Sequence, residues 1–137
     1  MENNLHSTDN GASFLQSVDH RYNIRGWLTH INNSTLTNDV GGANTNDDIN
    51  DLFGMQIVYN EEAPVVNVSN TVARQYNGNV SAIKWMTDNK KDTPMERIYG
   101  FHYDTNDRLT KSFYAANSGG GWTNEGGWYD EDDLDYD

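Results

Sequence analysis

The sequence predicts an all-β chain of antiparallel β-hairpins joined by long polar loops. Three observations favour this fold class. No window of the 137 residues repeats its apolar residues at helical spacing, and Asn, Asp and Gly recur throughout. In several runs, successive residues alternate between two faces, as they do in β-strands. Hydrophobic residues make up 35% and aromatic residues 12% of the chain, so we expect one domain with a small core rich in aromatic rings.

The first hairpin is expected over residues 17–31. Residues 17–22 place Val18, His20 and Tyr22 on one side of a strand, and a second run begins at Trp27. The four residues between them, Asn-Ile-Arg-Gly, have the composition of a turn. Residues 1–15, which precede the hairpin, contain no apolar run and are expected to be a flexible segment.

The middle of the chain alternates strands with polar stretches. Residues 32–51 consist mainly of Asn, Thr, Asp, Gly and Ser, so we expect a long surface loop there. Strand character returns at residues 52–59, 65–68 and 80–86. The clearest hairpin follows: residues 97–103 alternate, Asp-Thr-Asn-Asp at 104–107 forms the turn, and residues 108–114 return. Residues 118–137 are rich in glycine and acids and are expected to form a solvated tail.

An octamer recurs within the chain. Residues 22–29, YNIRGWLT, align without gaps on residues 103–110, YDTNDRLT. Each contains an aromatic residue, an Asn or Asp, a polar turn, and then Leu and Thr, so each predicts a strand end, a turn and a strand start. A shorter copy is YNGNV at residues 76–80, and a fourth copy begins at Leu134. The residues expected to define the motif are Tyr22, Asn23, Gly26, Leu28, Tyr76, Asn77, Gly78, Tyr103, Asp104, Arg108 and Leu109.

Four segments of the chain resemble the YD-repeat (Rhs) family in its Bacteroidetes-type members, over roughly residues 16–137. They are YNIRGWLT at residues 22–29, DLFGMQIVYN at 51–60, YNGNVSAIKW at 76–85 and YGFHYDTNDRL at 99–109. The resemblance implies that residues 16–117 are YD-repeat-like hairpins within a sheet of the hollow-shell type. It also implies that the chain is a fragment whose tail leads into a further repeat. In polymorphic-toxin members the shell surrounds a C-terminal toxin, and the repeats themselves are scaffold rather than catalyst. The chain departs from the family's Asp-Pro self-cleavage motif, because neither Pro64 nor Pro94 follows an Asp.

The expected partners follow partly from charge and partly from the resemblance. The net charge of -12 disfavours nucleic acid, and no stretch is apolar enough for membrane insertion. The resemblance implies an extracellular or cell-surface location, although the first residues do not form a signal peptide. It also implies neighbouring repeats of a parent shell, a cargo toxin or a surface glycan as partners. Exposed edge strands would allow the isolated chain to self-associate.

No catalytic site is expected. The chain has no cysteine and no GxSxG motif, the four histidines form no metal-binding spacing, and the 21 acids single out no pair. No cofactor is expected either; among ions, calcium suits the acidic clusters best, at residues 47–51 and 130–133. Trp122 and Trp128, which lie among glycines, are the candidate ligand surface.

The sequence therefore predicts a non-catalytic structural piece of an extracellular YD-repeat shell, used for encapsulation or surface display. A small surface module that binds carbohydrate or calcium is the alternative.

Overall fold

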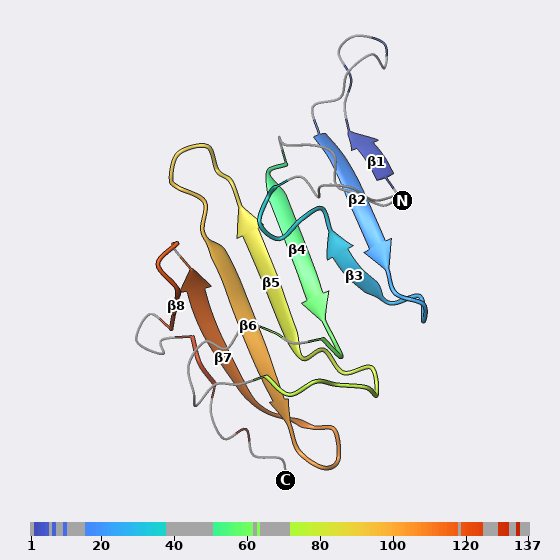
Figure 1. Cartoon of the computed structure of the whole chain (residues 1–137), viewed down its shortest axis with the longest axis vertical. Helices are drawn as coiled ribbons and strands as arrows, with labels where there is room; N and C mark the ends of the chain where they lie inside the picture. The colour runs from blue at the N-terminus through green and yellow to red at the C-terminus, as the bar shows by residue number, and fades with distance from the viewer. Residues whose placement is uncertain are drawn as a thin grey trace. The chain divides into compact units, whose positions relative to one another are not determined.

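The computed structural model describes residues 2–5, 7, 10, 16–37, 51–61, 63, 72–117, 119–124, 129–131 and 134. These residues form antiparallel β-strands and turns and contain no helix, so the all-β prediction is confirmed. The strands are β1 (Glu2–Leu5), β2 (Gln16–Tyr22), β3 (Leu28–Ile31), β4 (Phe53–Val58), β5 (Ala82–Thr87), β6 (Glu96–Tyr103), β7 (Leu109–Asn117) and β8 (Trp122–Thr123) (Figure 1).

The chain divides into two compact units. The first comprises Met1–Gln56 and Trp85–Pro94, and the second comprises Ile57–Lys84 and Met95–Asp137. Strands β4 and β5 each contribute residues to both units. Within each unit, the strands neighbour one another in the order in which they occur in the sequence.

The first unit contains the predicted β2–β3 hairpin. His20 pairs with Ile31 and Tyr22 with Leu28, with a register shift between Arg21 and Tyr22. Strand β1 pairs with the other side of β2, and Glu2 lies opposite Asp19. The sequence did not predict β1, because its residues, Glu-Asn-Asn-Leu, neither alternate nor carry β-branched side chains.

Buried polar residues anchor the two ends of the predicted loop 32–51. Asn32 is 1% exposed, and its side chain accepts from the Asp19 N–H at 2.7 Å and donates to the Phe53 carbonyl at 2.9 Å. It therefore joins β2 to the start of β4. Ser34 and Asp51 are also buried, so these parts of the segment are not the surface loop that the composition predicted. Residues 38–50 lie outside the described part of the chain.

The second unit contains the β6–β7 hairpin, in which pairing runs from Glu96 opposite Asn117 to Tyr103 opposite Leu109 (Figure 1). This hairpin is also as predicted. The buried core cluster of the unit consists of Val58, Ala82, Ile98 and Ala115. Phe113 is fully buried beside it, and its ring lies so close to Gly100 that a Cβ atom at that position would collide with it. Gly100 is therefore required by the packing of Phe113.

Several described residues after β7 pair with that strand. Strand β8 pairs Trp122 with Asn117 and Thr123 with Ala116. Further along, Ser112 and Glu131 exchange two backbone hydrogen bonds of 2.9 Å, and Leu134 donates to the carbonyl of Thr110 at 3.0 Å. The described part of the C-terminal segment is thus bonded to the sheet, whereas its charge predicted a solvated tail.

Two further expectations concern a strand at residues 65–68 and the absence of a membrane-spanning stretch. The strand predicted at 65–68 lies outside the described part of the chain. The described residues include no helix of the length and apolar character needed to cross a membrane.

Candidate functional site

The two aligned octamers form turns with the same hydrogen bonds. In the β2–β3 turn, Oδ1 of Asn23 accepts from the backbone N–H groups of Arg25 and Trp27, each at 3.0 Å. In the β6–β7 turn, Oδ1 of Asp104 accepts from those of Asn106 and Arg108, at 2.8 and 2.9 Å. One side-chain oxygen therefore holds the same two amides in both turns.

The backbone of the two turns matches as well. The N–H of Asn23 donates to the carbonyl of Trp27 at 2.9 Å, and that of Asp104 donates to the carbonyl of Arg108 at 2.9 Å. The residue in the left-handed conformation is Gly26 in one turn, with φ 78, and Asp107 in the other, with φ 61. Asp tolerates that conformation better than most residues, so the second turn forms without glycine.

The match extends into the strands. The register shift falls immediately before the aromatic residue in each hairpin, between Arg21 and Tyr22 and between His102 and Tyr103. The Thr that ends each octamer donates to a carbonyl of the preceding strand: Thr29 to Arg21 at 3.1 Å and Thr110 to His102 at 3.3 Å. The paired Leu28 and Leu109 lie opposite Tyr22 and Tyr103.

The segment at residues 76–80, which the sequence predicts as a shorter copy of the motif, covers the β6–β7 turn. The side chain of Asn77 donates to Asp107 at 2.6 Å, and the hydroxyl of Tyr103 donates to the carbonyl of Val80 at 2.8 Å. Gly78, which lies between Asn77 and Asn79, has φ 107, a backbone conformation that residues with a side chain rarely adopt. Tyr76 itself is 62% exposed. Burial raises the pKa of Tyr103, as expected for a phenol that another segment covers.

Charge distinguishes the β6–β7 turn from its counterpart. Nε of Arg108 donates to Oδ2 of Asp104 at 2.7 Å. The backbone N–H of Arg108 contributes most to holding the pKa of Asp104 below its ordinary value, and the guanidinium of Arg108 and the N–H of Asn106 act in the same direction. In the β2–β3 turn, Asn23 and Trp27 occupy these positions, so no ion pair can form there. Arg25 instead lies over the ring of Trp27, 5.1 Å from its centroid.

A row of aromatic rings lies on one face of β6 and β7. Tyr99 stacks on Phe101 with ring centroids 6.5 Å apart, and it meets Tyr114 at 5.4 Å. Tyr129 meets Tyr114 edge-on at 5.0 Å and is 56% exposed. Burial raises the pKa of Tyr99, and the neighbouring Tyr129, Asp130 and Glu131 add to the effect. Tyr129 therefore presents an open ring at the end of a packed aromatic row.

Sequence reasoning did not single out Tyr129, and it considered Asp130 only as part of an acidic cluster for calcium. Oδ1 of Asp130 accepts from the backbone N–H of Tyr114 at 2.6 Å, at a position on the edge of β7 between β8 and Glu131. The acidic run around these residues hid them, because its composition indicates solvation. The sequence signal that could have found them is that Tyr is followed by Asp here, as at Tyr103 and Asp104.

Of the two tryptophans predicted as a ligand surface, Trp122 and Trp128, the structure describes only Trp122. Trp122 is partly buried and packs against the core cluster of the second unit, which favours a structural role for its ring. Trp128 lies outside the described residues.

The described residues include no group of three or more His, Asp or Glu side chains placed to hold a metal ion. Of the acidic clusters suggested for calcium, residues 47–50 and 132–133 are outside the described part. Asp130 is engaged with Tyr114. His102 packs against Phe113 with centroids 5.9 Å apart, and burial and then the nearby Lys111 lower its pKa.

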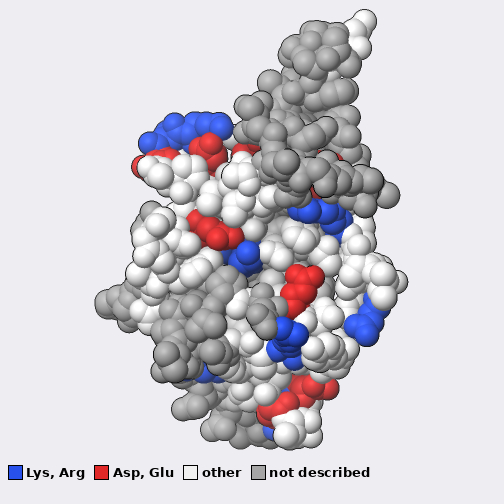
Figure 2. All heavy atoms as spheres, in the orientation of Figure 1, with Lys and Arg blue, Asp and Glu red and all other residues white. Residues whose placement is uncertain are grey.

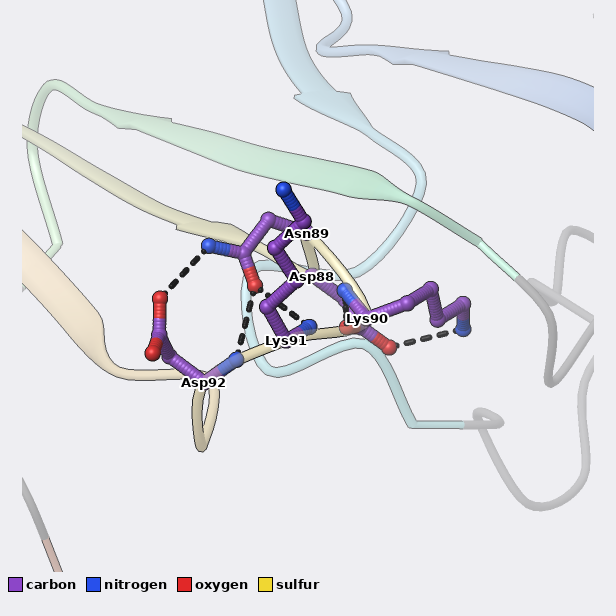
Figure 3. A network of polar contacts seen from close by, with 5 residues as sticks. All are labelled: Asp88, Asn89, Lys90, Lys91 and Asp92. Carbon is purple, nitrogen blue, oxygen red and sulfur yellow. Dashed lines mark hydrogen bonds and ion pairs between the residues drawn. The ribbon is translucent and has the colours of Figure 1, made fainter.

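The loop between β5 and β6 closes on itself through polar contacts (Figure 3). Asp88 accepts from the backbone N–H and from Nζ of Lys90, both at 2.7 Å, and these bonds lower its pKa. Asn89 accepts from the backbone of Lys91 and Asp92 and donates to the Asp92 carboxylate at 2.9 Å. These bonds occupy both carboxylate oxygens of Asp88 and one of Asp92. Figure 2 likewise shows acidic and basic groups adjoining one another on the face drawn.

Comparisons with protein-family models, with curated proteins and with solved structures found no match for this chain.

Proposed function

We propose that the chain is a non-catalytic scaffold module, a part of a YD-repeat-like extracellular shell that encapsulates a cargo or displays it at the surface. The observation that supports this proposal is the pair of equivalent turns at Asn23 and Asp104. They agree in side-chain acceptor, backbone bonds and register shift. A turn that recurs with this agreement is typical of proteins built by repeating one supersecondary unit.

The segment at residues 76–80 supports the same proposal. It bonds to the β6–β7 turn through Asn77 and Val80, so one copy of the motif packs against another. In repeat proteins such contacts between adjacent units supply much of the stability. A scaffold would use them to extend a sheet, whereas a cargo toxin would supply the chemistry.

The test joins two copies of the full chain head to tail in one polypeptide. Adjacent modules of a scaffold stabilise each other, so the tandem protein should unfold in one transition at a higher temperature than the single chain. The control joins the chain to an unrelated soluble domain of similar size. A tandem protein in which both copies melt at the temperature of the single chain would contradict the scaffold proposal. Near-ultraviolet circular dichroism, which reports the packing of the 4 Trp and 8 Tyr residues, follows the transition.

Glycan binding is the second candidate, and Tyr129 is the observation that favours it. Its exposed ring adjoins Tyr114 and lies beside Asp130, an arrangement in which a sugar ring could stack on the aromatic face and hydrogen-bond to a carboxylate. Retention on a glycan array that Tyr129→Ala abolishes would support this function. Tyr76→Ala is the matched control, because Tyr76 is also exposed but has no place in the aromatic row.

A further inference from the structure

Asn77 and Gly78 form an Asn-Gly pair in the segment that covers the β6–β7 turn. Asn77 is exposed, and the bend at residues 76–78 belongs to neither a helix nor a strand. Gly78 has no side chain to shield its backbone nitrogen. Within the described part of the chain, no hydrogen bond uses the N–H of Gly78. This nitrogen is therefore open beside the side-chain amide of Asn77.

Hydrogen bonds hold both ends of the Asn77 amide. Nδ2 donates to Oδ1 of Asp107 at 2.6 Å, and Oδ1 accepts from the backbone N–H of Asn79 at 3.0 Å. A donor at Oδ1 stabilises the negative charge that develops on this oxygen when a nucleophile attacks Cγ. The Asn77 carbonyl is thus activated next to an open nucleophile.

We propose that Asn77 is a modification site at which the chain deamidates without an enzyme. The Gly78 nitrogen, which has lost its proton to water or hydroxide, attacks Cγ of Asn77. The new C–N bond closes a succinimide ring, and Nδ2 leaves as ammonia. Water then opens the ring and leaves aspartate or isoaspartate at position 77. The reaction consumes water, releases ammonia and needs no oxidant or reductant, and it does not depend on the scaffold role.

The product places two carboxylates where the structure has a donor and an acceptor. Asp107 loses the donor at 2.6 Å, and a second negative charge takes its place and repels it. The side chain of Asn79 donates to the same oxygen at 3.4 Å, which is too long to replace the lost bond. The same segment supplies the Val80 carbonyl that accepts from Tyr103. Deamidation therefore loosens the cover of the β6–β7 turn.

Asn79 is a matched control within the same segment. Its side chain bonds to the same carboxylate as that of Asn77, but Val80 follows it in the sequence. The branched side chain of Val80 hinders attack by the Val80 nitrogen, so Asn79 should keep its amide. The chain has a second Asn-Gly pair at residues 10–11, which falls in a different peptide and extends beyond the described residues.

The test stores the full chain at neutral and at alkaline pH and maps its peptides by mass spectrometry. Asn77 should be converted to aspartate and isoaspartate while Asn79 is retained. Conversion should be faster at alkaline pH, because the attacking nitrogen must lose its proton. The peptide RQYNGNVSA, residues 74–82, gives the rate without the fold. Recovery of intact Asn77 from the folded chain, whether or not the peptide converts, would overturn the proposal, as would equal conversion of Asn77 and Asn79.

Asn77→Asp reproduces one of the two products and tests the structural consequence. It should lower the urea midpoint of the original chain and should lower it less in Asp107→Gly, which lacks the facing carboxylate. Glycine suits this position, because Asp107 has φ 61 and Gly26 occupies the equivalent place in the other turn. If Asn77→Asp alone does not fold, recovery of folding in the double variant gives the same answer. An equal loss in both backgrounds would show that repulsion by Asp107 is not the consequence of deamidation.

Discussion

Arg108 and Asp104 form an ion pair of 2.7 Å within a turn whose geometry does not require it. The equivalent turn keeps its backbone bonds with the neutral Asn23 in place of the aspartate. The amide oxygen alone is therefore enough to shape this turn, and the charge at Asp104 adds a dependence on pH.

That dependence can be measured with Asp104→Asn. Because the pKa of Asp104 is lowered from 3.8 in the folded chain, its carboxylate contributes stability that is complete above the unfolded value and is lost as the pH falls through the folded one. The stability difference between the original chain and the variant should be constant near neutral pH and should shrink below about pH 4. Urea unfolding at a series of pH values measures it. A difference that stays constant down to pH 2 would show that the charge of Asp104 is irrelevant.

Asn23→Ala should destabilise the chain by about 1 kcal/mol, because the amides of Arg25 and Trp27 lose their shared acceptor. Asn23→Asp keeps an oxygen at that position and should have less than half of this effect. Chemical denaturation of both variants measures the free energy of unfolding. If the two variants lost the same stability, the acceptor role of Asn23 would be wrong.

Asn32→Ala should have a larger effect, about 2–3 kcal/mol. Its side chain is buried, and its removal leaves the N–H of Asp19 and the carbonyl of Phe53 without these partners away from water. Asn60→Ala, at an exposed position, serves as the control and should change stability by less than about 0.5 kcal/mol. Similar midpoints of unfolding for the two variants would count against the linking role of Asn32.

Gly100→Ala should destabilise the chain by about 1–3 kcal/mol, because the added methyl group collides with the buried ring of Phe113. Gly120→Ala is the matched control, since a Cβ there has no atom within 4 Å. Thermal melts followed by near-ultraviolet circular dichroism report both stability and aromatic packing. An unchanged melting temperature for Gly100→Ala would mean that the Phe113 side chain can rearrange to make room for the added methyl group.

Tyr103→Phe should cost about 1 kcal/mol through the lost bond to Val80. Tyr22→Phe should leave the stability of the isolated chain unchanged, because its ring is half exposed. Denaturant midpoints of the two variants compare the covered turn with the open one. Equal losses would indicate that Tyr22 is also bonded to a covering segment within the chain.

The two hairpins could be predicted from the sequence because alternation and turn chemistry agreed in both. Tyr22 and Tyr103 mark the strand ends, and the Asx residue that follows each marks the turn. The identity of the two turns was also predictable in outline, since the octamers align without gaps. In the structure, the Asx side chains of the two turns accept hydrogen bonds from equivalent amides.

Other features could not be predicted, because they depend on partners distant in the sequence. Asn32 was assigned to a surface loop from its polar neighbours, yet its bonds to Asp19 and Phe53 make burial favourable. Repulsion among acids predicted a solvated tail, but backbone pairing of Glu131 with Ser112 holds that segment to β7. The aromatic contact of Tyr129 with Tyr114 exists only because of this pairing.

The shared turn has a consequence for variation. Its hydrogen bonds use the backbone and a single Asn or Asp side chain, so the first two residues at the tip can differ: Ile24 and Arg25 in one copy, and Thr105 and Asn106 in the other. The third, Gly26 or Asp107, must tolerate the left-handed conformation. The frame is constant while the tip changes from apolar and cationic to polar and acidic. In that respect the motif is comparable to a recognition loop on a rigid framework, in which the sequence of the loop changes while the strands that carry it stay the same.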